Sequence, residues 1–405
     1  MNDLLLRLGM DDISEFFDEC YEKALKEDAI PFWLDENYIR KTAEEFPFLE
    51  NNLDDVLRAL PAVIENPDLV MFAKTLYHML EVNKHHEEVF EGLAFPKAPE
   101  GENSLGYDMF SFYPMFSRIR DAYAGLREKG VDEAILNTTA AGVGGSLTAS
   151  SERVGRLAFS RIYFLWCTTH KNAALLSVGR FAFEIRKNSK LNIRVLKNTQ
   201  NELKILMTEG VHIHDNGFIL GSVGAENEEN SFVTQYNETA EFYEGNEAES
   251  TPARVNKTLT KLLKSEWECI YSPGDSVVEL HIPVGKPLTH EVVDGALNEG
   301  RRVIKSIYPE ENFKIFSCFS WLLAPELKDI LKPESNIMKF AERFTKYPMK
   351  CEGLDIFSFV FIKSISKIEE VDLDSLPENS SLEKNLKEYY KAGNFVHETG
   401  GVFLF

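Results

Sequence analysis

The chain has 405 residues, of which 44% are hydrophobic and 27% are charged, and these proportions are typical of a globular protein. Its length indicates two domains, because a single core seldom organises so many residues. Its formal net charge of −21 repels phosphate backbones and argues against nucleic acid as a partner. No apolar run reaches the roughly 18 residues that a membrane span needs, so we predict no membrane partner.

The five cysteines are widely spaced, odd in number and include no Cys-x-x-Cys pair. This pattern favours reduced thiols that are buried as small apolar side chains, as in cytoplasmic proteins. The leucine cluster near the amino terminus is short and has aspartates around it, so it does not predict a signal peptide. We therefore expect a cytoplasmic protein. Nothing in the sequence indicates an oligomeric state.

The amino-terminal part of the chain has the pattern of a helical domain. Across residues 1–132, apolar side chains recur at helical spacing, and Pro47 and Pro61 interrupt the pattern where helices can end. We predict an all-α domain over residues 1–140. The glycine-rich segment Ala141–Ser146 follows, and we interpret it either as a hinge between domains or as a loop at a site.

The second domain is predicted to span residues 141–405 and to mix strands with helices. Three short runs have strand character: Phe181–Arg186, Leu191–Leu196 and Leu203–Ile213. Residues 226–249 contain eight glutamates and no lysine or arginine, so we predict an exposed acidic loop inserted in this domain. A short helix is expected at Thr258–Trp267.

The centre of the second domain is a strand, a tight loop, a helix and a second strand. These elements are predicted at Ser276–Ile282, Pro283–Leu288, Thr289–Ile307 and Phe313–Trp321. Because side chains alternate along a strand, Glu279 and His281 share one face and can point into one cleft. Each can accept a proton near neutral pH when buried, so both are candidate general bases. The alternative is that both side chains simply face solvent or a helix.

The loop between this strand and helix has features of an anion site. Gly285 allows close backbone approach or a positive φ, and Lys286 adds a positive charge. Thr289 can cap the helix, whose first N–H groups suit a phosphate. Glu291 in the first turn opposes an anion, and the two prolines of the loop donate no N–H. An anion cradle and a plain strand-to-helix connection are both consistent with these residues.

Two longer segments carry an ordered set of short motifs. They are HIPVGKPLTHEVVDGALNEG at His281–Gly300 and FSCFSWLLAPELKDILKPESNIMKF at Phe316–Phe340. His-Ile-Pro, Gly-x-Pro-Leu before a helix, Ser-Trp-Leu-Leu and Ser-Asn-Ile follow one another there. In this order they resemble the carboxy-terminal domain of the GNAT-like acyltransferase family. The resemblance extends to LLSVGRFAFE at Leu175–Glu184 and to KGVDEAILNTT at Lys129–Thr139.

The resemblance implies an α+β protein, in which an all-α N-terminal domain precedes a GNAT-like mixed α/β domain with a central, mostly antiparallel sheet. In that superfamily, acyl-CoA lies between two splayed parallel strands, and its pyrophosphate meets the N-terminus of the helix that links them. The corresponding strands here are Ser276–Ile282 and Phe313–Trp321. The cofactor, acetyl-CoA or another acyl-CoA, is then expected at Ile282, Val284, Gly285, Lys286 and Thr289.

The resemblance also implies an acyl-CoA-dependent N-acyltransferase that acts on a small-molecule or peptide amine. Glu279 or His281 would be the general base. The leaving thiolate would take its proton from Ser320, from Ser317 or Cys318 on the same strand, or from Tyr347, with Cys318 more simply a core residue. Four residues are candidates for substrate binding: Arg180, Glu184, Trp321 and Asn336. The arginine among them is expected either to pair with an acid or to bind a carboxylate.

Two other interpretations stay open. The superfamily's glycine-rich pyrophosphate signature does not follow the strand Ser276–Ile282, which favours a catalytically inactive GNAT-like module that binds a ligand or a protein. His212 and His214 share a strand face beside Asp215 and can chelate a metal, as a metal-dependent hydrolase would require. We assign no residue to a metal, because the sequence has no His-Glu-x-x-His motif.

Overall fold

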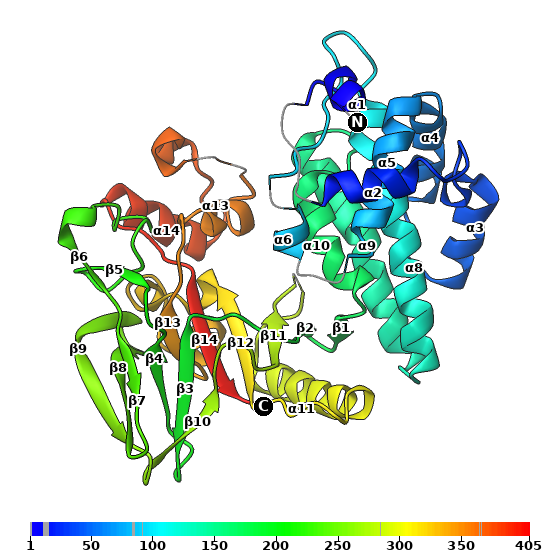
Figure 1. Ribbon diagram of the computed structural model, residues 1–405. Coiled ribbons are helices and arrows are strands. Elements are labelled where there is room, and N and C mark those ends of the chain that lie inside the picture. The colour runs from blue at the N-terminus through cyan, green and yellow to red at the C-terminus, as the bar shows by residue number, and fades with distance from the viewer. Residues whose placement is uncertain are drawn as a thin grey trace. The chain divides into compact units, whose positions relative to one another are not determined.

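The computed structural model describes residues 2–10, 16–82, 86–90, 92–283, 285–363, 365 and 367–405. They form two compact units, Met1–Val178 and Gly179–Phe405, coloured from blue to green and from green to red in Figure 1. In the part of the chain that is described, no helix combines the length and the apolar character that crossing a membrane requires.

The first unit is built of helices, as the sequence predicts. Its helices are α1 (Asn2–Arg7), α2 (Phe17–Ala24), α3 (Glu36–Glu45), α4 (Leu53–Ile64), α5 (Pro67–Met79), α6 (His86–Phe90), α7 (Leu105–Met109), α8 (Phe112–Glu128), α9 (Glu133–Val154) and α10 (Arg161–Lys171), and the strand β1 (Leu175–Val178) ends it. Aromatic rings fill much of its core. Phe48 packs edge to face on Phe116, and Phe72 does so on Phe110.

The predicted hinge at Ala141–Ser146 is wrong, because this segment lies in the middle of α9. Asp132 caps the helix by accepting a hydrogen bond from the N–H of Ala134, and Gly155 ends it with a φ of 78°. Gly144 allows close packing, since a Cβ there would lie 2.5 Å from the carbonyl oxygen of Phe48. The boundary predicted after residue 140 therefore falls inside a helix, and the compact units divide after Val178 instead.

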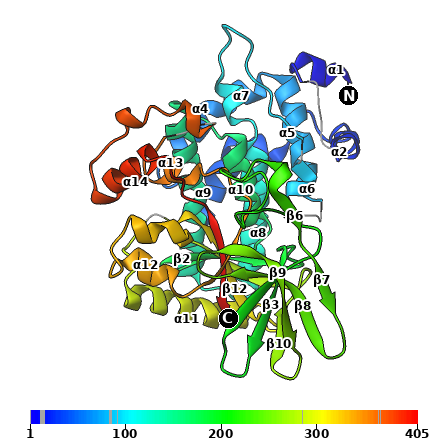
Figure 2. The same ribbon diagram turned by 90° about the vertical axis from the view of Figure 1, so that its left-hand side faces the viewer.

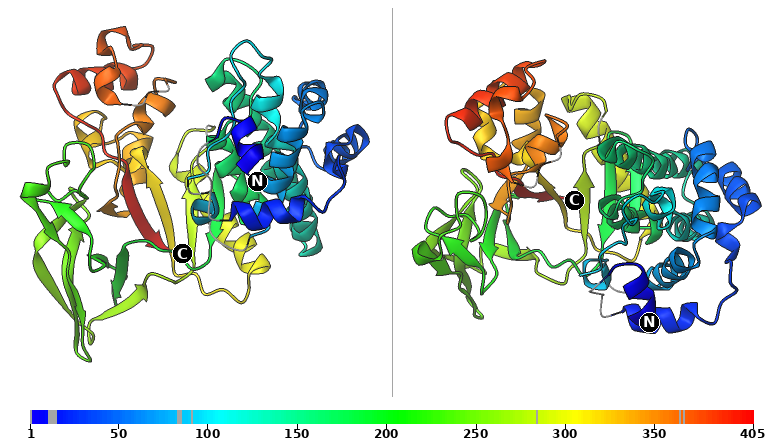
Figure 3. Two further views of the ribbon diagram at one scale, coloured as in Figure 1. Left: turned by 45° about the horizontal axis from the view of Figure 1, so that its top comes forward. Right: turned by 90° about the horizontal axis from the view of Figure 1, so that it is seen from above.

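The second unit contains the mostly antiparallel sheet that the sequence predicts. Its strands are ordered β2 (Phe181–Arg186), β11 (Val277–His281), β12 (Ile315–Ser320), β14 (Thr399–Leu404) and β13 (Thr345–Pro348). Only β11 and β12 run parallel, and α11 (His290–Ile307) connects them. In Figure 3 the red β14 lies beside the yellow β12.

A second sheet occupies the region where an acidic loop and a short helix are predicted, so both of those predictions are wrong. Its strands are β10 (Trp267–Tyr271), β3 (Ile193–Asn198), β4 (Leu203–Met207), β8 (Phe242–Glu249) and β7 (Tyr236–Glu238), with β9 (Arg254–Leu263) paired to β8, and a separate hairpin joins β5 (His212–His214) to β6 (Ser231–Val233). Tyr243 and Ala248 of β8 are buried and enter two different apolar clusters, so this acidic segment is part of the core of the unit. Glu247 also forms an ion pair with Lys204 across the sheet.

The two faces of the first sheet have different coverings. On one face lies α11, and its Gly300 allows a close approach, since a Cβ there would lie 2.4 Å from the ring of Phe183. The helix α12 (Asn336–Ala341) lies next to α11 (Figure 2). On the other face, Val277, Ile315 and Val402 enter a core shared with the second sheet. Polar side chains can therefore gather only on the rest of this second face.

A smaller cluster of helices completes the unit. Its α13 (Asp355–Phe359) and α14 (Ser381–Lys391) share an apolar core that includes Ile356, Phe357 and Leu386.

Candidate active site

The parallel strands β11 and β12 separate partway along their length. They pair only at Val278 with Phe316 and at Glu279 with Ser317, although both strands continue further. Beyond this row β11 stays paired with β2 as far as His281, and β12 stays paired with β14 to its own end. The outer strands β2 and β14 thus hold β11 and β12 in place, while the edges of β11 and β12 that face each other separate. The family resemblance implies this separation.

A pocket of about 460 Å³ lies at the end where the two strands part. Its wall contains the residues that follow each strand, Ile282 after β11 and Trp321 after β12. The remaining lining residues are Arg180, Pro283, Gly285, Lys286, Pro287, Leu288, Leu322, Ser335, Asn336, Ile337 and Phe359. Most of this wall is apolar, and its positive charge comes from Arg180 and Lys286.

The structure brings six of the predicted binding residues together around this pocket. They are Arg180, Ile282, Gly285, Lys286, Trp321 and Asn336. Val284 lies outside the described residues. Thr289 does not line the pocket but caps α11, as predicted, by accepting a hydrogen bond from the N–H of Val292.

Arg180 supports the loop that follows β11. Its guanidinium donates hydrogen bonds to the carbonyl oxygens of Lys286, at 2.6 Å from Nε, and of Pro283. The expected ion pair with an acid is therefore replaced by two bonds to the backbone. Burial lowers the pKa of Arg180, yet a guanidinium stays charged in proteins, so the pocket keeps this cation.

The N-terminus of α11 already binds a carboxylate. Glu291 accepts hydrogen bonds from its own N–H and from the hydroxyl of Thr289, and both lower the pKa of Glu291. Gly285, in the loop before this helix, lies beside Arg180. A Cβ at this position would lie 3.8 Å from Nη1 of Arg180, an ordinary contact.

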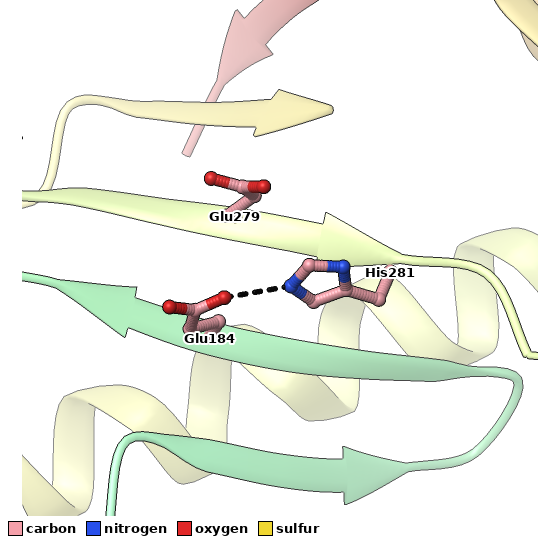
Figure 4. Close-up of side chains that lie close together, drawn as sticks. All are labelled: Glu184, Glu279 and His281. Atoms are coloured by element: carbon pink, nitrogen blue, oxygen red, sulfur yellow. Dashed lines mark hydrogen bonds and ion pairs between the residues drawn. The ribbon is translucent and has the colours of Figure 1, made fainter. Parts of the chain in front are cut away.

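Four charged side chains form a network on the face opposite α11, and Figure 4 shows three of them, Glu184, Glu279 and His281. Arg186 lies 2.7 Å from Oε2 of Glu279 and 3.7 Å from Oε1 of Glu184. His281 lies 2.8 Å from the other carboxylate oxygen of Glu184. The prediction that Glu279 and His281 share a face is correct, and Glu184 joins them because β2 places it directly opposite Glu279.

The network favours the protonated form of His281. Burial alone lowers the pKa of this imidazole, but the hydrogen bond to Glu184 and the charges of Glu279 and Glu184 outweigh that effect and raise it. The bond to Glu184 also engages the ring nitrogen Nε2 of His281, so of the two candidate bases we assign the role to Glu279.

Two hydroxyl groups lie on the same face as Glu279. Ser317 is its direct neighbour across the parallel pair and is 2% exposed. The ring of Tyr347 lies across Gly400, because a Cβ at residue 400 would be 2.4 Å from its Cζ. Since Tyr347 is on β13 and Gly400 on the adjacent β14, the phenol points toward β12. Burial and the charge of Glu279 raise the pKa of Tyr347, which keeps this phenol protonated.

The other predicted acid, Ser320, has a structural contact. Its hydroxyl oxygen accepts a hydrogen bond from the N–H of Leu322 and so caps the short 3-10 helix Trp321–Leu323. The neighbouring Cys318 is buried, and burial raises the pKa of its thiol, so it behaves as a core residue. Tyr347 is thus the better placed proton donor.

Metal-ligand geometry occurs in one place among the described residues. The ligand atoms of Glu184, Glu279 and His281 lie within 4.8 Å of one another. Arg186 already forms ion pairs with both carboxylates there. These residues therefore satisfy one another's charges and are a poor site for a metal cation. His212 and His214 share β5 but belong to no such three-ligand group in the described part of the chain.

One residue of this site is absent from the prediction, and the position of another was not foreseen. Arg186 could have been found, because it is two residues after Glu184 on β2 and must share its face. Ser317 was a candidate proton donor, like the other serine and the cysteine of its strand, but its place opposite Glu279 was not predictable, since it depends on the register between two strands that are far apart in the sequence.

Solved structures with the same fold are acyltransferases. An acyltransferase mutant in complex with octanoyl-CoA is similar with a TM-score of 0.65 and 16% identity, over 100% of this chain and 99% of that chain. An acyltransferase in complex with decanoyl-CoA and teicoplanin has a TM-score of 0.62 and 16% identity, over 100% and 98% of the two chains. The chain thus has the fold of these acyltransferases.

The sequence comparison identifies the family. The model of the GNAT-like C-terminal domain matches residues 153–403, which is more than half of the chain, and the chain therefore belongs to this family. No curated protein matches the chain.

Proposed function

We propose that this protein is an acyltransferase that transfers an acyl group from acyl-CoA to an amine. The observation that carries the proposal is the separation of β11 from β12 beyond Glu279 and Ser317, with a pocket at the open end. Proteins of the same fold bind octanoyl-CoA and decanoyl-CoA, which supports an acyl-CoA as donor. One of them also holds teicoplanin, which supports a small-molecule acceptor.

The pocket suits an amphiphilic, polyanionic donor. Its apolar wall, formed in part by Ile282, Trp321 and Ile337, fits a pantetheine arm. Arg180 and Lys286 place positive charge at its rim, which a phosphate requires in a chain whose net charge is −21. Because Glu291 puts a negative charge in the first turn of α11, we assign the phosphates to Arg180 and Lys286.

The reaction follows from the groups on the face of the sheet. The amine nitrogen attacks the thioester carbonyl carbon, so a C–N bond forms and the C–S bond breaks. Glu279 accepts the proton that the nitrogen loses, and Tyr347 gives a proton to the thiolate of CoA. Arg186 orients Glu279 through their ion pair, and His281 pairs with Glu184 beside it.

Calorimetric titration with acetyl-CoA, octanoyl-CoA and CoA tests the donor site. We expect saturable binding and a release of free CoA thiol when an amine is added. Arg180→Ala removes both hydrogen bonds to the loop carbonyls, and we expect the Kd for octanoyl-CoA to rise about tenfold or more. Arg302→Ala, on the exposed side of α11, is the matched control and should leave the Kd unchanged. Absence of binding at millimolar concentration would refute the proposal.

A ligand-binding module without catalysis is the second candidate. The occupied N-terminus of α11 and the ion pair between Glu279 and Arg186 favour it, because both satisfy groups that catalysis would use. This candidate predicts saturable acyl-CoA binding with no thiol release in the presence of any amine.

A further inference from the structure

We infer that Phe359 binds the adenine ring of the donor, and that the pocket therefore selects acyl-CoA over an acyl phosphopantetheine, which lacks the adenosine. The inference rests on the proposed acyl-CoA site and adds a specificity residue and a donor class to it.

Phe359 belongs to an insertion in the sheet and not to the two strands that part. Antiparallel strands such as β13 and β14 can be joined by a two-residue turn, yet residues 349–398 separate them here. The insertion contains α13 and α14, and Phe359, the last residue of α13, lines the pocket. The insertion therefore supplies a part of the pocket wall that neither β11 nor β12 provides.

The ring of Phe359 is exposed, although α13 buries its other aromatic ring. Phe357 packs on Phe361 and on Tyr390 in the apolar core of the insertion. Phe359 is 62% exposed and is paired with no other ring in the part of the chain that the structure describes. An exposed aromatic ring in the wall of a pocket is available to stack on a planar group of a ligand.

The backbone that follows Phe359 holds the ring at this place. The N–H of Lys363 donates a hydrogen bond to the carbonyl oxygen of Phe357 at 2.8 Å, which turns the chain back on α13. Within this turn Ile362 has a φ of 51°, a conformation that a β-branched residue seldom adopts. Such backbone persists only where the surrounding structure maintains it, and it is found preferentially near sites of function.

The cations of the pocket indicate which part of the donor meets the ring. Arg180 and Lys286, to which we assign the phosphates, line the same pocket as Phe359. The thioester has to reach the gap between β11 and β12, so the nucleotide end of the donor points away from that gap. In CoA one ribose joins the phosphates to the adenine. The adenine is therefore the planar group that follows the phosphates toward Phe359.

The acyl chain belongs to the other end of the donor. It is attached to the sulfur, which enters the gap between the strands, and the apolar residues that directly follow β11 and β12 are Ile282 and Trp321. Stacking of a base on an aromatic side chain strengthens binding about fivefold or more. A donor without the adenine loses this contribution, and this loss is the basis of the selection.

The test measures the Kd values of CoA, octanoyl-CoA and S-octanoyl phosphopantetheine for the full chain, by displacement of etheno-CoA, a CoA with a fluorescent adenine. We expect Phe359→Leu, which keeps an apolar side chain and removes the ring, to raise the Kd of CoA and of octanoyl-CoA by the same factor, about fivefold or more. The Kd of octanoyl phosphopantetheine should stay within about twofold. Phe359→Trp keeps a ring and should retain the affinity for CoA.

Ile362→Ala is the matched control, because Ile362 is 82% exposed on the same turn and does not line the pocket. It should leave all three Kd values unchanged. Since Phe359 is exposed, Phe359→Leu should also leave the Tm unchanged.

Three results would overturn the inference. They are an unchanged Kd of CoA in Phe359→Leu, a loss of affinity for octanoyl-CoA alone, which would put the acyl chain on the ring, and an equal loss for octanoyl phosphopantetheine. Failure of the unmodified chain to bind any of the three ligands would overturn the proposed function as well.

Discussion

Glu279 lies between a cation on one side and two hydroxyl groups on the other. Arg186 on β2 pairs with its carboxylate, while Ser317 on β12 and Tyr347 on β13 lie beyond it on the same face. In the proposed reaction these residues have different roles. Arg186 balances the charge of Glu279, Glu279 accepts a proton from the acceptor, and Tyr347 gives a proton to the leaving group. We therefore expect substitutions at these residues to affect different kinetic parameters.

Replacing Glu279 with glutamine should remove the base and preserve the shape of the side chain. We expect kcat to fall about 10²- to 10⁴-fold, with the Kd for octanoyl-CoA unchanged, because the pocket for the donor does not include this residue. Glu268→Gln, at an exposed position on β10, is the control. Steady-state kinetics and calorimetry on the same preparations distinguish the two effects. A kcat within threefold of the unmodified value would contradict the role of Glu279.

His281 should make stability depend on pH. Its pKa is raised in the folded chain, so its contribution to stability is fully present below the unfolded histidine pKa of about 6.5 and is lost as the pH rises through the folded value. We expect the stability difference between the unmodified chain and His281→Gln to shrink as the pH increases above about 6.5. Urea unfolding at pH 6 and pH 9 measures this. A difference that grows with pH would show that His281 is buried in its neutral form.

At the scale of elements, the local features of β11 and α11 were predictable, and their distant partners were not. Alternation placed Glu279 and His281 on one face, and Thr289 was recognised as a cap, because each depends on neighbouring residues alone. Arg180 contacts a loop more than 100 residues later in the chain, so its bonds to the backbone depend on tertiary structure. Ala141–Ser146 looked flexible because its glycines were not known to serve close packing.

Two glycines of α11 test how closely this helix packs on the sheet. A Cβ at Gly300 would lie 2.4 Å from the ring of Phe183, whereas a Cβ at Gly295 would have no neighbour within 4 Å. We expect Gly300→Ala to lower the free energy of unfolding by about 1–3 kcal/mol through overpacking. Gly295→Ala should raise it by roughly 0.5–1 kcal/mol through helix propensity. Denaturant unfolding checks both, and equal effects would contradict the close contact between α11 and β2.

At the scale of the whole molecule, the division into a helical unit and a GNAT-like unit was predictable from composition and motif order. The boundary and the second sheet were not, because helix and strand periods are hard to separate in a segment such as Thr258–Trp267. The net charge of −21 repels a polyanionic donor, so binding of that donor requires positively charged side chains at its site. Arg180 and Lys286 supply them at the pocket that defines the site.

The central claim is that acyl-CoA binds where β11 and β12 part, and a crystal structure of the chain with octanoyl-CoA tests it most directly. We predict that the pantetheine arm lies between the two strands beyond Glu279 and Ser317, with the phosphates beside Arg180 and Lys286. Octanoyl-CoA bound elsewhere, with protein side chains filling the space between these strands, would contradict the claim.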